Sequence, residues 1–293
     1  MSKVGYLGPK GTFTHQAVHA LFDQHEFLSY RTIPECLDAV EKGEIDVGVV
    51  PLENTIEGTV HLTIDYLIHH VDLPIVAEAD LPIEQHLLVP HSFDGDLSKV
   101  EAIYSHSHAV AQCHQFIHHQ CERAEVEYST STGEAARMVN EKGGNIAAIG
   151  NRQAAEEYGL KVLRENIHDY PNNHTRFAVV QKGSEPIEMR ELREVNRKTT
   201  ISVTLPSDYA GALHQVLSAF SWRRMNLSKI ESRPMKTGLG NYFFIIDVDQ
   251  PYDGVLFPGV QAELQALGCD LKVLGTYPCF HLATASSKEA TTD

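Results

Sequence analysis

Two short runs of polar side chains carry most of the chemical information in this sequence. Residues 172–177 read Asn-Asn-His-Thr-Arg-Phe, and residues 50–55 read Val-Pro-Leu-Glu-Asn-Thr. Each run places amide and hydroxyl groups beside an apolar strand, where they can meet a ligand at a sheet edge without a metal or a cofactor. The pattern predicts a shaped polar pocket for a small anion.

Alternating strands and helices must position these two runs. This alternation predicts an α/β fold with a largely parallel sheet. We expect two similar lobes joined by extended crossovers, with the ligand site in the cleft between them. Lobe 1 is expected at about 1–76 and 163–182, and lobe 2 at about 77–162, together forming a first domain at 1–182. The periodicity indicates strands at 4–7, 27–32, 45–50, 100–104, 124–128, 146–149 and 176–181, helices at 12–22, 34–42, 107–119 and 132–142, and an extended stretch at 74–90.

A second module follows the first domain. Residues 183–198 carry little apolar periodicity and are expected to form a linker. Strands are then expected at 199–205, 227–234, 241–248 and 271–277, helices at 209–222 and 256–267, and a hairpin turn at 238–240. This order, βαββαβ, is the ferredoxin-like arrangement, and it predicts a second domain at 199–282. The polar residues 283–293 are expected to be a disordered tail.

The composition excludes several classes of function. A formal charge of −15 over 293 residues, with no cluster of Lys or Arg, argues against a nucleic-acid partner. No apolar run approaches the roughly 18 residues that cross a bilayer, and no secretory leader is visible, so we expect a cytoplasmic protein without a membrane partner. The 17 histidines lack ligand spacing, so no metal site is expected. No C-x-x-C pair occurs, and free buried thiols are expected at Cys36, Cys113, Cys121, Cys269 and Cys279.

Motifs along nearly the whole chain resemble, in order, those of the prephenate dehydratase family. They lie at residues 5–14, 51–58, 105–113 and 175–177. The C-terminal module resembles an ACT regulatory domain, with one ligand loop at 211–213 and a second at 231–234. The resemblance implies two lobes like those of type II periplasmic binding proteins. It also implies a carbon–oxygen lyase without a cofactor, which converts prephenate to phenylpyruvate, CO2 and water in phenylalanine biosynthesis.

The resemblance assigns roles to residues of the cleft. Thr175 is the expected catalytic group. A threonine hydroxyl is a poor acid, so we expect it to donate a hydrogen bond to the departing ring hydroxyl, and full proton transfer stays open. Backbone amides at the turn 8–12 are expected to bind a carboxylate. The other residues expected to contact substrate are Glu53, Asn54, Thr55, Ser105, Gln112, Arg176 and Phe177.

Two of these assignments stay open on the sequence. Arg176 could clamp a substrate carboxylate or pair with Glu53 as scaffold, and we favour scaffold because an acidic neighbour suits a guanidinium group. The family often reads Ser-His-Pro-Gln at the start of the helix after Ser105, where this chain has His108 in place of the glutamine. Whether His108 takes over a substrate contact is therefore open.

The resemblance also implies feedback regulation. L-phenylalanine is the expected effector, and an ACT domain binds it between a loop of one chain and a strand of another. Side-by-side pairing of these domains implies a homodimer or a homotetramer. The residues expected to bind the effector are Gly211, Ala212, Leu213, Asn226, Leu227, Glu231, Ser232, Arg233 and Pro234.

Two other functions are compatible with these motifs. An arogenate dehydratase would run the same chemistry on a substrate that carries an ammonium group in place of the keto oxygen. A non-catalytic small-molecule binding protein would share the two-lobed fold, although such proteins are normally exported. The loop at 8–12 lacks the Gly-Lys-Ser/Thr order of a phosphate-binding loop, so nucleotide binding is not expected.

Overall fold

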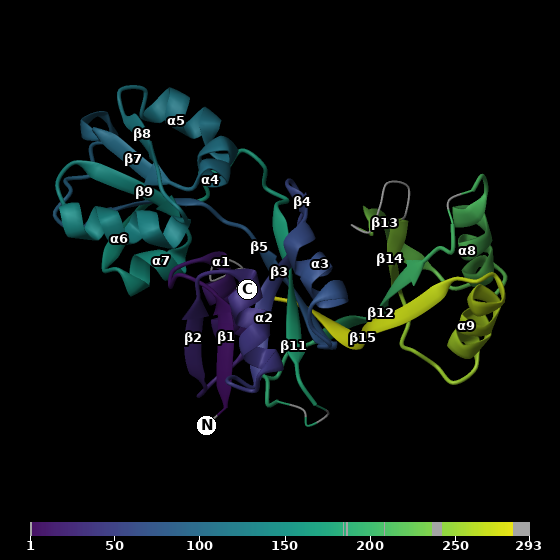
Figure 1. Cartoon of the computed structure of the whole chain (residues 1–293). Helices are drawn as coiled ribbons and strands as arrows, with labels where there is room; N and C mark the ends of the chain where they lie inside the picture. The colour runs from purple at the N-terminus through teal and green to yellow at the C-terminus, as the bar shows by residue number, and fades with distance from the viewer. Residues whose placement is uncertain (1, 184, 186, 208, 236–241, 284–293) are drawn as a thin grey trace, which may run out of the picture.

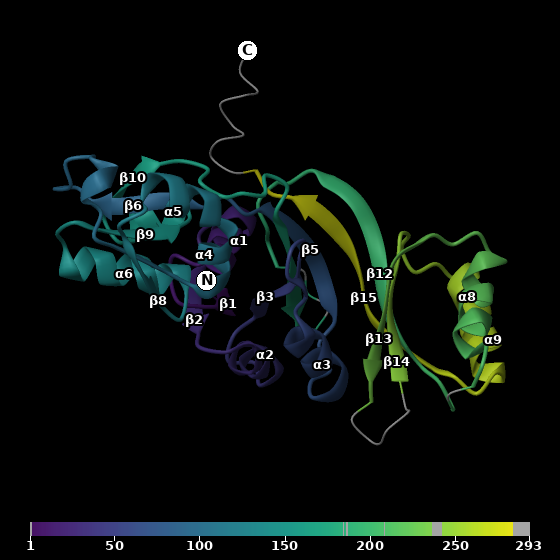
Figure 2. The same cartoon turned by 90° about the horizontal axis from the view of Figure 1, so that it is seen from above.

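The chain folds into two lobes and a C-terminal domain (Figure 1). The computed structural model describes residues 2–183, 185, 187–207, 209–235 and 242–283. Lobe 1 comprises β1–β5, β11 and α1–α3, lobe 2 comprises β6–β10 and α4–α7, and the C-terminal domain comprises β12–β15, α8 and α9. Figure 2 shows β12 and β15 as long curved strands that connect lobe 1 to the C-terminal domain.

Lobe 1 is a sheet with helices on both faces. Its strand order is β5-β11-β3-β1-β2, with β4 paired to β3. Helix α1 packs on one face, and α2 and α3 pack on the other. Thr12 and Thr32 cap the first two helices through their side chains, as expected of hydroxyl residues at helix starts. The elements are β1 (Lys3–Leu7), α1 (Phe13–Leu21), β2 (Glu26–Tyr30), α2 (Ile33–Glu41), β3 (Val47–Asn54), β4 (Gly58–Thr59), α3 (His61–His69), β5 (Ile75–Pro82) and β11 (His174–Gln181).

Lobe 2 is a five-stranded sheet in the order β10-β6-β9-β7-β8. The helix expected at 107–119 is two helices, because Cys113 leaves helical geometry with φ −118° and ψ 20°. The elements are β6 (His86–Pro90), the 3-10 helix η1 (Leu97–Lys99), β7 (Ala102–Ser105), α4 (Ser107–Gln112), α5 (His114–Gln120), β8 (Glu125–Tyr128), α6 (Thr132–Lys142), β9 (Ile146–Gly150), α7 (Arg152–Glu157) and β10 (Leu160–Arg164).

Strand pairing corrects the expected lobe boundaries. The boundary at 76/77 falls inside β5, which pairs with β11 as far as Pro82. The boundary at 162/163 falls inside β10, which pairs with β6 in lobe 2. The crossovers are therefore residues 83–85 and 165–173. A continuous extended stretch such as 74–90 does not reveal where the chain leaves one sheet for another, because both halves are buried strands.

The C-terminal domain has the expected βαββαβ order. Across the sheet, its strands stand in the spatial order β13-β14-β12-β15, which is the ferredoxin-like arrangement. Helices α8 and α9 cover one face of this sheet. The expected turn at 238–240 lies outside the described residues, as does the tail beyond residue 283. The elements are β12 (Glu194–Thr204), α8 (Ala212–Ser221), β13 (Leu227–Pro234), β14 (Tyr242–Val248), α9 (Leu256–Ala266) and β15 (Asp270–His281).

The C-terminal domain and lobe 1 share one sheet, and the face of the C-terminal sheet opposite α8 and α9 packs into the core of lobe 1. Strand β15 pairs in parallel with β5, which joins the two sheets into a ten-stranded one. Gly275 permits this approach, because a Cβ there would lie 2.2 Å from the carbonyl oxygen of Ile75. Phe243 of β14 is 1% exposed and packs in the same cluster as Leu67 of α3. Burying such a side chain contributes roughly 1.5–3 kcal/mol, so the two parts are firmly docked.

The expected linker at 183–198 is not a free spacer. Strand β12 already begins at Glu194, and Ile187, Met189 and Leu192 pack against the core beneath α1.

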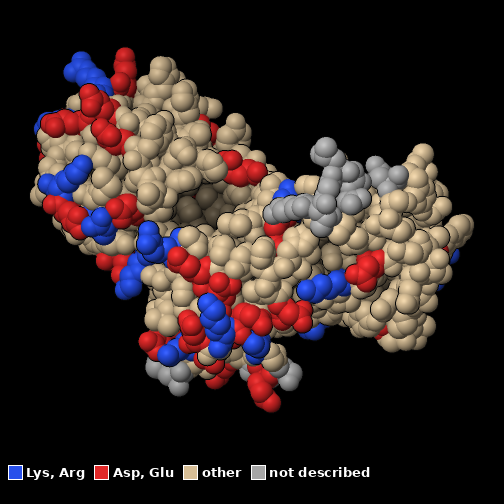
Figure 3. Space-filling view, in the orientation of Figure 1, with Lys and Arg blue, Asp and Glu red and all other residues tan. Residues whose placement is uncertain are grey.

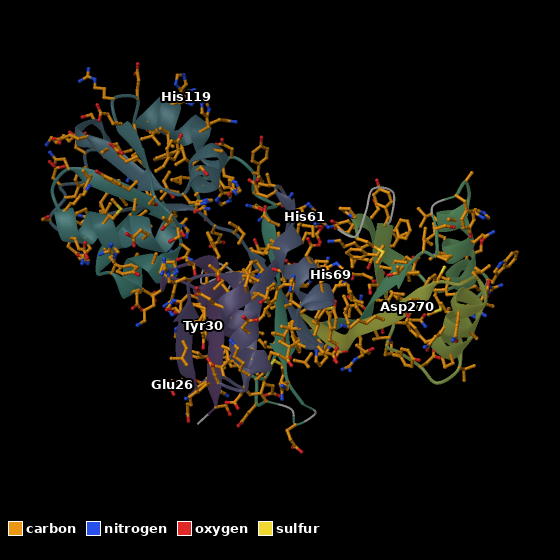
Figure 4. All side chains as sticks on the ribbon, in the orientation of Figure 1. Glu26, Tyr30, His61, His69, His119 and Asp270 are labelled. Atoms are coloured by element: carbon orange, nitrogen blue, oxygen red, sulfur yellow. The ribbon has the colours of Figure 1, made fainter. Side chains whose placement is uncertain are left out.

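Helix α3 of lobe 1 also packs against the C-terminal domain. The rings of His69 and Phe243 are in contact, with 5.3 Å between their centroids. Figure 4 labels His61 and His69 on the side of α3 that faces the C-terminal domain. This packing depends on side chains far apart in the sequence, so local periodicity did not reveal it.

Candidate active site

A cleft of about 570 Å³ lies between the two lobes. Figure 3 shows it as a hollow between lobe 2 and lobe 1, with an uncharged floor. Strands β1, β2 and β3 run parallel, and the cleft is lined by Leu7, Arg31 and Asn54 at their carboxyl ends. Ligands of open parallel sheets bind at this edge. The position of the cleft therefore agrees with the expected site between the lobes.

Thr175 and Asn54 form a hydrogen-bonded pair at the wall of the cleft. The Asn54 Oδ1 accepts from the backbone N–H groups of Ile56 and Glu57 at 3.0 and 3.1 Å, which fixes the orientation of the amide. Its Nδ2 therefore donates to the Thr175 Oγ1, at 2.9 Å. Because the threonine oxygen accepts this bond, its own proton remains free to be donated into the cleft.

A chain of amide side chains continues from Asn54 into lobe 2. Asn54 Nδ2 also donates to Asn173 Oδ1 at 2.8 Å, and Asn173 Nδ2 donates to Gln112 Oε1 at 3.1 Å. Gln85 Nε2 lies 3.5 Å from the same Gln112 oxygen. Both bonds use Oε1, so the NH2 group of Gln112 remains available to a ligand. The sequence placed Asn173 in the polar run at 172–177 but assigned no individual contact to it.

Positive electrostatic potential reaches the cleft from two helices and one side chain. Helices α1 and α6 both begin at the cleft wall, and their first-turn N–H groups have no acceptor inside the helix. Gly133 lets α6 approach the turn 8–12 closely, since a Cβ at Gly133 would lie 2.2 Å from the Lys10 carbonyl oxygen. Within the part of the chain that the structure describes, Arg31 is the one Lys or Arg lining the cleft. Sequence analysis missed Arg31 and α6 as site elements.

The turn 8–12 was expected to bind a carboxylate through its backbone N–H groups, but two of these groups already have acceptors within the protein. The Gly8 N–H donates to the Tyr30 carbonyl, and the Gly11 N–H donates to His15 Nδ1 at 3.1 Å. These two amides are therefore occupied. The free donors lie one step later, in the first turn of α1 after the capping residue Thr12.

Comparison with known proteins identifies the family. The family model described as prephenate dehydratase matches residues 4–185. The chain belongs to the prephenate dehydratase family. It is 53% identical to the prephenate dehydratase of Bacillus subtilis over 96% of this chain and 100% of that protein.

Two solved structures extend the comparison. The prephenate dehydratase of Arthrobacter aurescens in complex with L-Phe is 34% identical, with a TM-score of 0.81, and covers 94% of this chain and 89% of its own. A structure described as a novel type of quorum quenching acylase, GqqA, is 24% identical, with a TM-score of 0.80 over 94% of this chain and 98% of its own. That second likeness shows the fold alone.

Not all of the family positions named from the sequence meet at the cleft. Phe177 is 1% exposed and lines it, together with Asn54, Gln112 and Thr175. Ser105 does not line it. Its side chain is fully buried and donates to the Ile149 carbonyl at 2.8 Å. The hydroxyl of Thr55 is also occupied, since it donates to the His174 carbonyl and accepts from the His174 N–H, both at 2.9 Å.

Arg176 and Glu53 lie on the opposite face of the sheet. The Arg176 Nη1 donates to Glu53 Oε2 at 2.7 Å, which is the pairing that the favoured scaffold interpretation expects. Both residues line a second cavity, of about 600 Å³, between β11 and the strands β12 and β15. The cations of this cavity are paired with its carboxylates, as in the ion pair of Lys198 with Glu78 at 3.3 Å. We therefore assign the chemistry to the cleft between the lobes.

Two histidines at the start of α4 line the cleft. His106 caps the helix, and burial lowers its pKa, as does the neighbouring His108. The His108 Nδ1 lies 3.7 Å from Glu57 Oε2, so a residue of lobe 2 faces a carboxylate of lobe 1 across the opening. The glutamine position of the family thus carries a side chain that contacts the other lobe.

The residues expected to bind an effector fall on two faces of the C-terminal sheet. Gly211 has φ +92° and precedes α8 on the helix side. The Ala212 N–H there already donates to the Tyr209 carbonyl at 3.1 Å, and Leu213 follows in the first turn. Glu231 and Arg233 instead point toward lobe 1, where Glu231 accepts from Thr59 at 2.6 Å and Arg233 pairs with Asp65 at 3.0 Å. The other expected positions, Asn226, Leu227, Ser232 and Pro234, lie just before β13 or within it, and Ser232 and Pro234 are exposed.

Other reactive groups stand apart from this site. All five cysteines are buried and unpaired, as expected, and burial raises the pKa of Cys36 and of Cys279 to about 12. Within the described residues, no group of three or more His, Cys, Asp or Glu side chains is arranged to hold a metal ion. No helix of the described residues is both long and apolar enough to cross a membrane.

Proposed function

We propose that this chain catalyses the decarboxylating dehydration of prephenate to phenylpyruvate. One observation carries the proposal: the hydroxyl of Thr175 accepts from Asn54, so its proton is directed to a ligand in the cleft of a prephenate dehydratase fold. The substrate needs a hydrogen-bond donor at its ring hydroxyl and positive potential for two carboxylates. The cleft offers both.

The reaction moves one electron pair through the ring. The bond from the ring to its carboxylate breaks, CO2 leaves, and the electrons aromatise the ring and expel the hydroxyl as hydroxide. The prephenate dianion thus gives the phenylpyruvate anion, CO2 and hydroxide. Negative charge grows on the departing oxygen, so a fixed donor there stabilises the transition state more than the ground state. Thr175 supplies this donor, and Asn54 holds it in place.

Binding of the dianion requires local positive potential in a chain of net charge −15. The first turns of α1 and α6, the Arg31 guanidinium and the Gln112 amide supply it. The leaving carboxylate is best held weakly, since tight binding of its charge would oppose the loss of CO2. We therefore place the pyruvyl carboxylate, which stays on the product, at Arg31.

We further propose that the C-terminal domain is an ACT domain that binds L-phenylalanine in a homodimer or a homotetramer. Its strand order and the left-handed Gly211 before α8 support this proposal. So does the relative from Arthrobacter aurescens, which was solved with L-Phe. Strand β13 is an edge of the sheet, and Ile230 on it is 42% exposed, as suits pairing with a second copy.

The test is incubation of the purified chain with prephenate and, separately, with arogenate, followed by product analysis. We expect phenylpyruvate from prephenate, slower turnover of arogenate, and inhibition by added L-phenylalanine. Failure to form phenylpyruvate would remove the enzyme function. Faster turnover of arogenate would make the chain an arogenate dehydratase, and full activity at saturating L-phenylalanine would remove the effector.

A further inference from the structure

A network of ion pairs joins lobe 1 to the C-terminal domain directly behind Thr175. The next residue on β11, Arg176, projects from the opposite face of the strand. Its guanidinium donates to Glu53 at 2.7 Å, to Glu78 at 2.9 and 2.5 Å, and to Asp247 at 2.8 Å. The three carboxylates come from β3, β5 and β14, and β14 belongs to the C-terminal domain.

The network closes into a ring through the C-terminal domain. The second oxygen of Asp247 accepts from Thr200 at 2.7 Å, Thr200 lies 2.5 Å from the Tyr277 hydroxyl, and Tyr277 lies 3.5 Å from Glu78. Asp247, Thr200 and Tyr277 are at most 3% exposed. Burial raises the pKa of Tyr277, and the charges of Asp247 and Glu78 raise it further, so the phenol stays neutral. A buried polar ring with every member paired is rigid.

Two lysines extend this network. Lys198 binds Glu78 at 3.3 Å, and Lys229 binds Glu53 at 3.2 Å and Glu231 at 3.5 Å. Together with Arg176 they set three cations against the carboxylates of Glu53, Glu78, Asp247 and Glu231. Burial lowers the pKa of Arg176, but its bonds to Glu78 and the charge of Asp247 more than compensate, so the guanidinium stays charged. The Asp247 side chain is only 4% exposed, so loss of its carboxylate would remove a charge partner of Arg176 on the side of the guanidinium where water has least access.

Two successive residue pairs between strands β11 and β3 connect this network to the cleft. On the cleft side, Thr175 opposes Asn54, and on the far side, Arg176 opposes Glu53. The register of β11 against β3 shifts immediately after Arg176. On its other side β11 keeps an unbroken register with β5 here, with Thr175 opposite Leu81 and Arg176 opposite Asp80. On the β3 side the ladder is disrupted, so the side-chain pairs with Asn54 and Glu53 hold the two strands together next to the irregularity.

We infer that Asp247 of the C-terminal domain is a positioning residue for the reaction, acting on Thr175 through Arg176. Asp247 is the one residue of the C-terminal domain, among those described, to which Arg176 donates a hydrogen bond. The alignment of the catalytic hydroxyl thus depends on where β14 sits against lobe 1. This inference rests on the proposed function, because it concerns the same hydroxyl.

The experiment is Asp247→Asn in the full-length chain. Both oxygens of Asp247 accept a bond, one from Arg176 and one from Thr200. The Thr200 hydroxyl can turn to accept from the new NH2 group, so the certain effect of the substitution is the loss of the carboxylate charge that faces the guanidinium. We expect kcat for prephenate to fall about tenfold, since small misplacements of a catalytic group are costly, while KM stays nearly unchanged. In a Thr175→Val background, the same substitution should cause no further loss, because the hydroxyl that it positions is absent.

A matched control separates positioning from domain docking. Asp65→Asn breaks an ion pair between lobe 1 and the C-terminal domain that lies outside the Arg176 network, that of Asp65 with Arg233 at 3.0 Å. We expect this variant to lower the unfolding temperature and to keep the wild-type kcat. Equal losses of kcat from both variants would reduce Asp247 to a docking residue and overturn the inference.

Two further outcomes would also overturn it. These are a wild-type kcat in folded Asp247→Asn, and an undiminished effect of Asp247→Asn in the Thr175→Val background. If Asp247→Asn does not fold, Thr200→Val removes one bond to Asp247 and should lower kcat in the same Thr175-dependent manner. If wild-type chain forms no phenylpyruvate, the proposed function fails, which is a result distinct from any of these.

Discussion

Replacing Thr175 by valine should remove the chemistry and leave the fold. Valine has the same shape and lacks the hydroxyl, and the site is only 8% exposed. Asn54 Nδ2 loses one acceptor but keeps Asn173 Oδ1 at 2.8 Å and the His174 carbonyl at 3.1 Å. The amide therefore stays in place, and the loss in unfolding free energy should be about 1 kcal/mol.

The expected loss of activity is much larger than the loss of stability. Removing one preorganised donor at a site of developing charge costs about 10²–10³-fold in kcat, or about 2.7–4 kcal/mol. KM should change little, because Arg31, Gln112 and the helix termini bind the carboxylates independently of Thr175. Thr175→Ser is the matched control. It keeps the hydroxyl and loses one methyl group, worth about 0.8 kcal/mol of burial.

The assay is steady-state formation of phenylpyruvate from prephenate, with thermal unfolding of each variant measured in parallel. We expect kcat in the order wild type, then Thr175→Ser, then Thr175→Val far below. A Thr175→Val variant with the wild-type kcat would refute the reasoning. So would equal losses in the serine and valine variants, because the methyl group would then matter and the hydroxyl would not.

Three further predictions follow from the site and from its burial. Asn54→Asp should lower kcat about 10²-fold, because the carboxylate accepts the Thr175 proton and turns the donor away from the cleft; kinetics equal to wild type would contradict the proposed hydrogen-bond direction. Arg31→Ala should raise KM about ten- to hundredfold with kcat little changed, as expected for a lost charge-assisted bond, and an unchanged KM would remove Arg31 from the site. Burial lowers the pKa of His86 to about 4, whereas the unfolded chain binds that proton at about 6.5. The unfolding free energy should therefore fall as the pH drops from about 6.5 to about 4, and less steeply in His86→Asn; denaturant titrations with equal slopes would contradict this.

Helices and strands were predictable where the burial of a single face produces the apolar periodicity of the sequence. The helix at 132–142 and the strand at 227–234 have the bounds expected from the sequence. Helix α3 was missed, because its buried residues include Asp65, whose partner Arg233 lies in another domain. A buried carboxylate looks like a surface residue until its partner is known.

The residues of the candidate site were also predictable only in part. Motif resemblance brought Thr175, Asn54 and Gln112 to the cleft, and the structure places all three there. It also named Ser105, whose hydroxyl is taken by a backbone carbonyl on the neighbouring strand β9. Arg31 carries no local signal, because a single arginine after a strand is ordinary. Only the parallel arrangement of β1, β2 and β3 brings it to the cleft.

The most direct test of the central claim is a crystal structure of the wild-type chain with a stable prephenate analogue. We predict the analogue in the cleft between the lobes, with its ring oxygen within hydrogen-bond distance of Thr175 Oγ1 and with Asn54 Nδ2 still donating to that atom. An analogue bound in the second cavity behind β11, or a ring oxygen facing any group other than Thr175, would contradict the account.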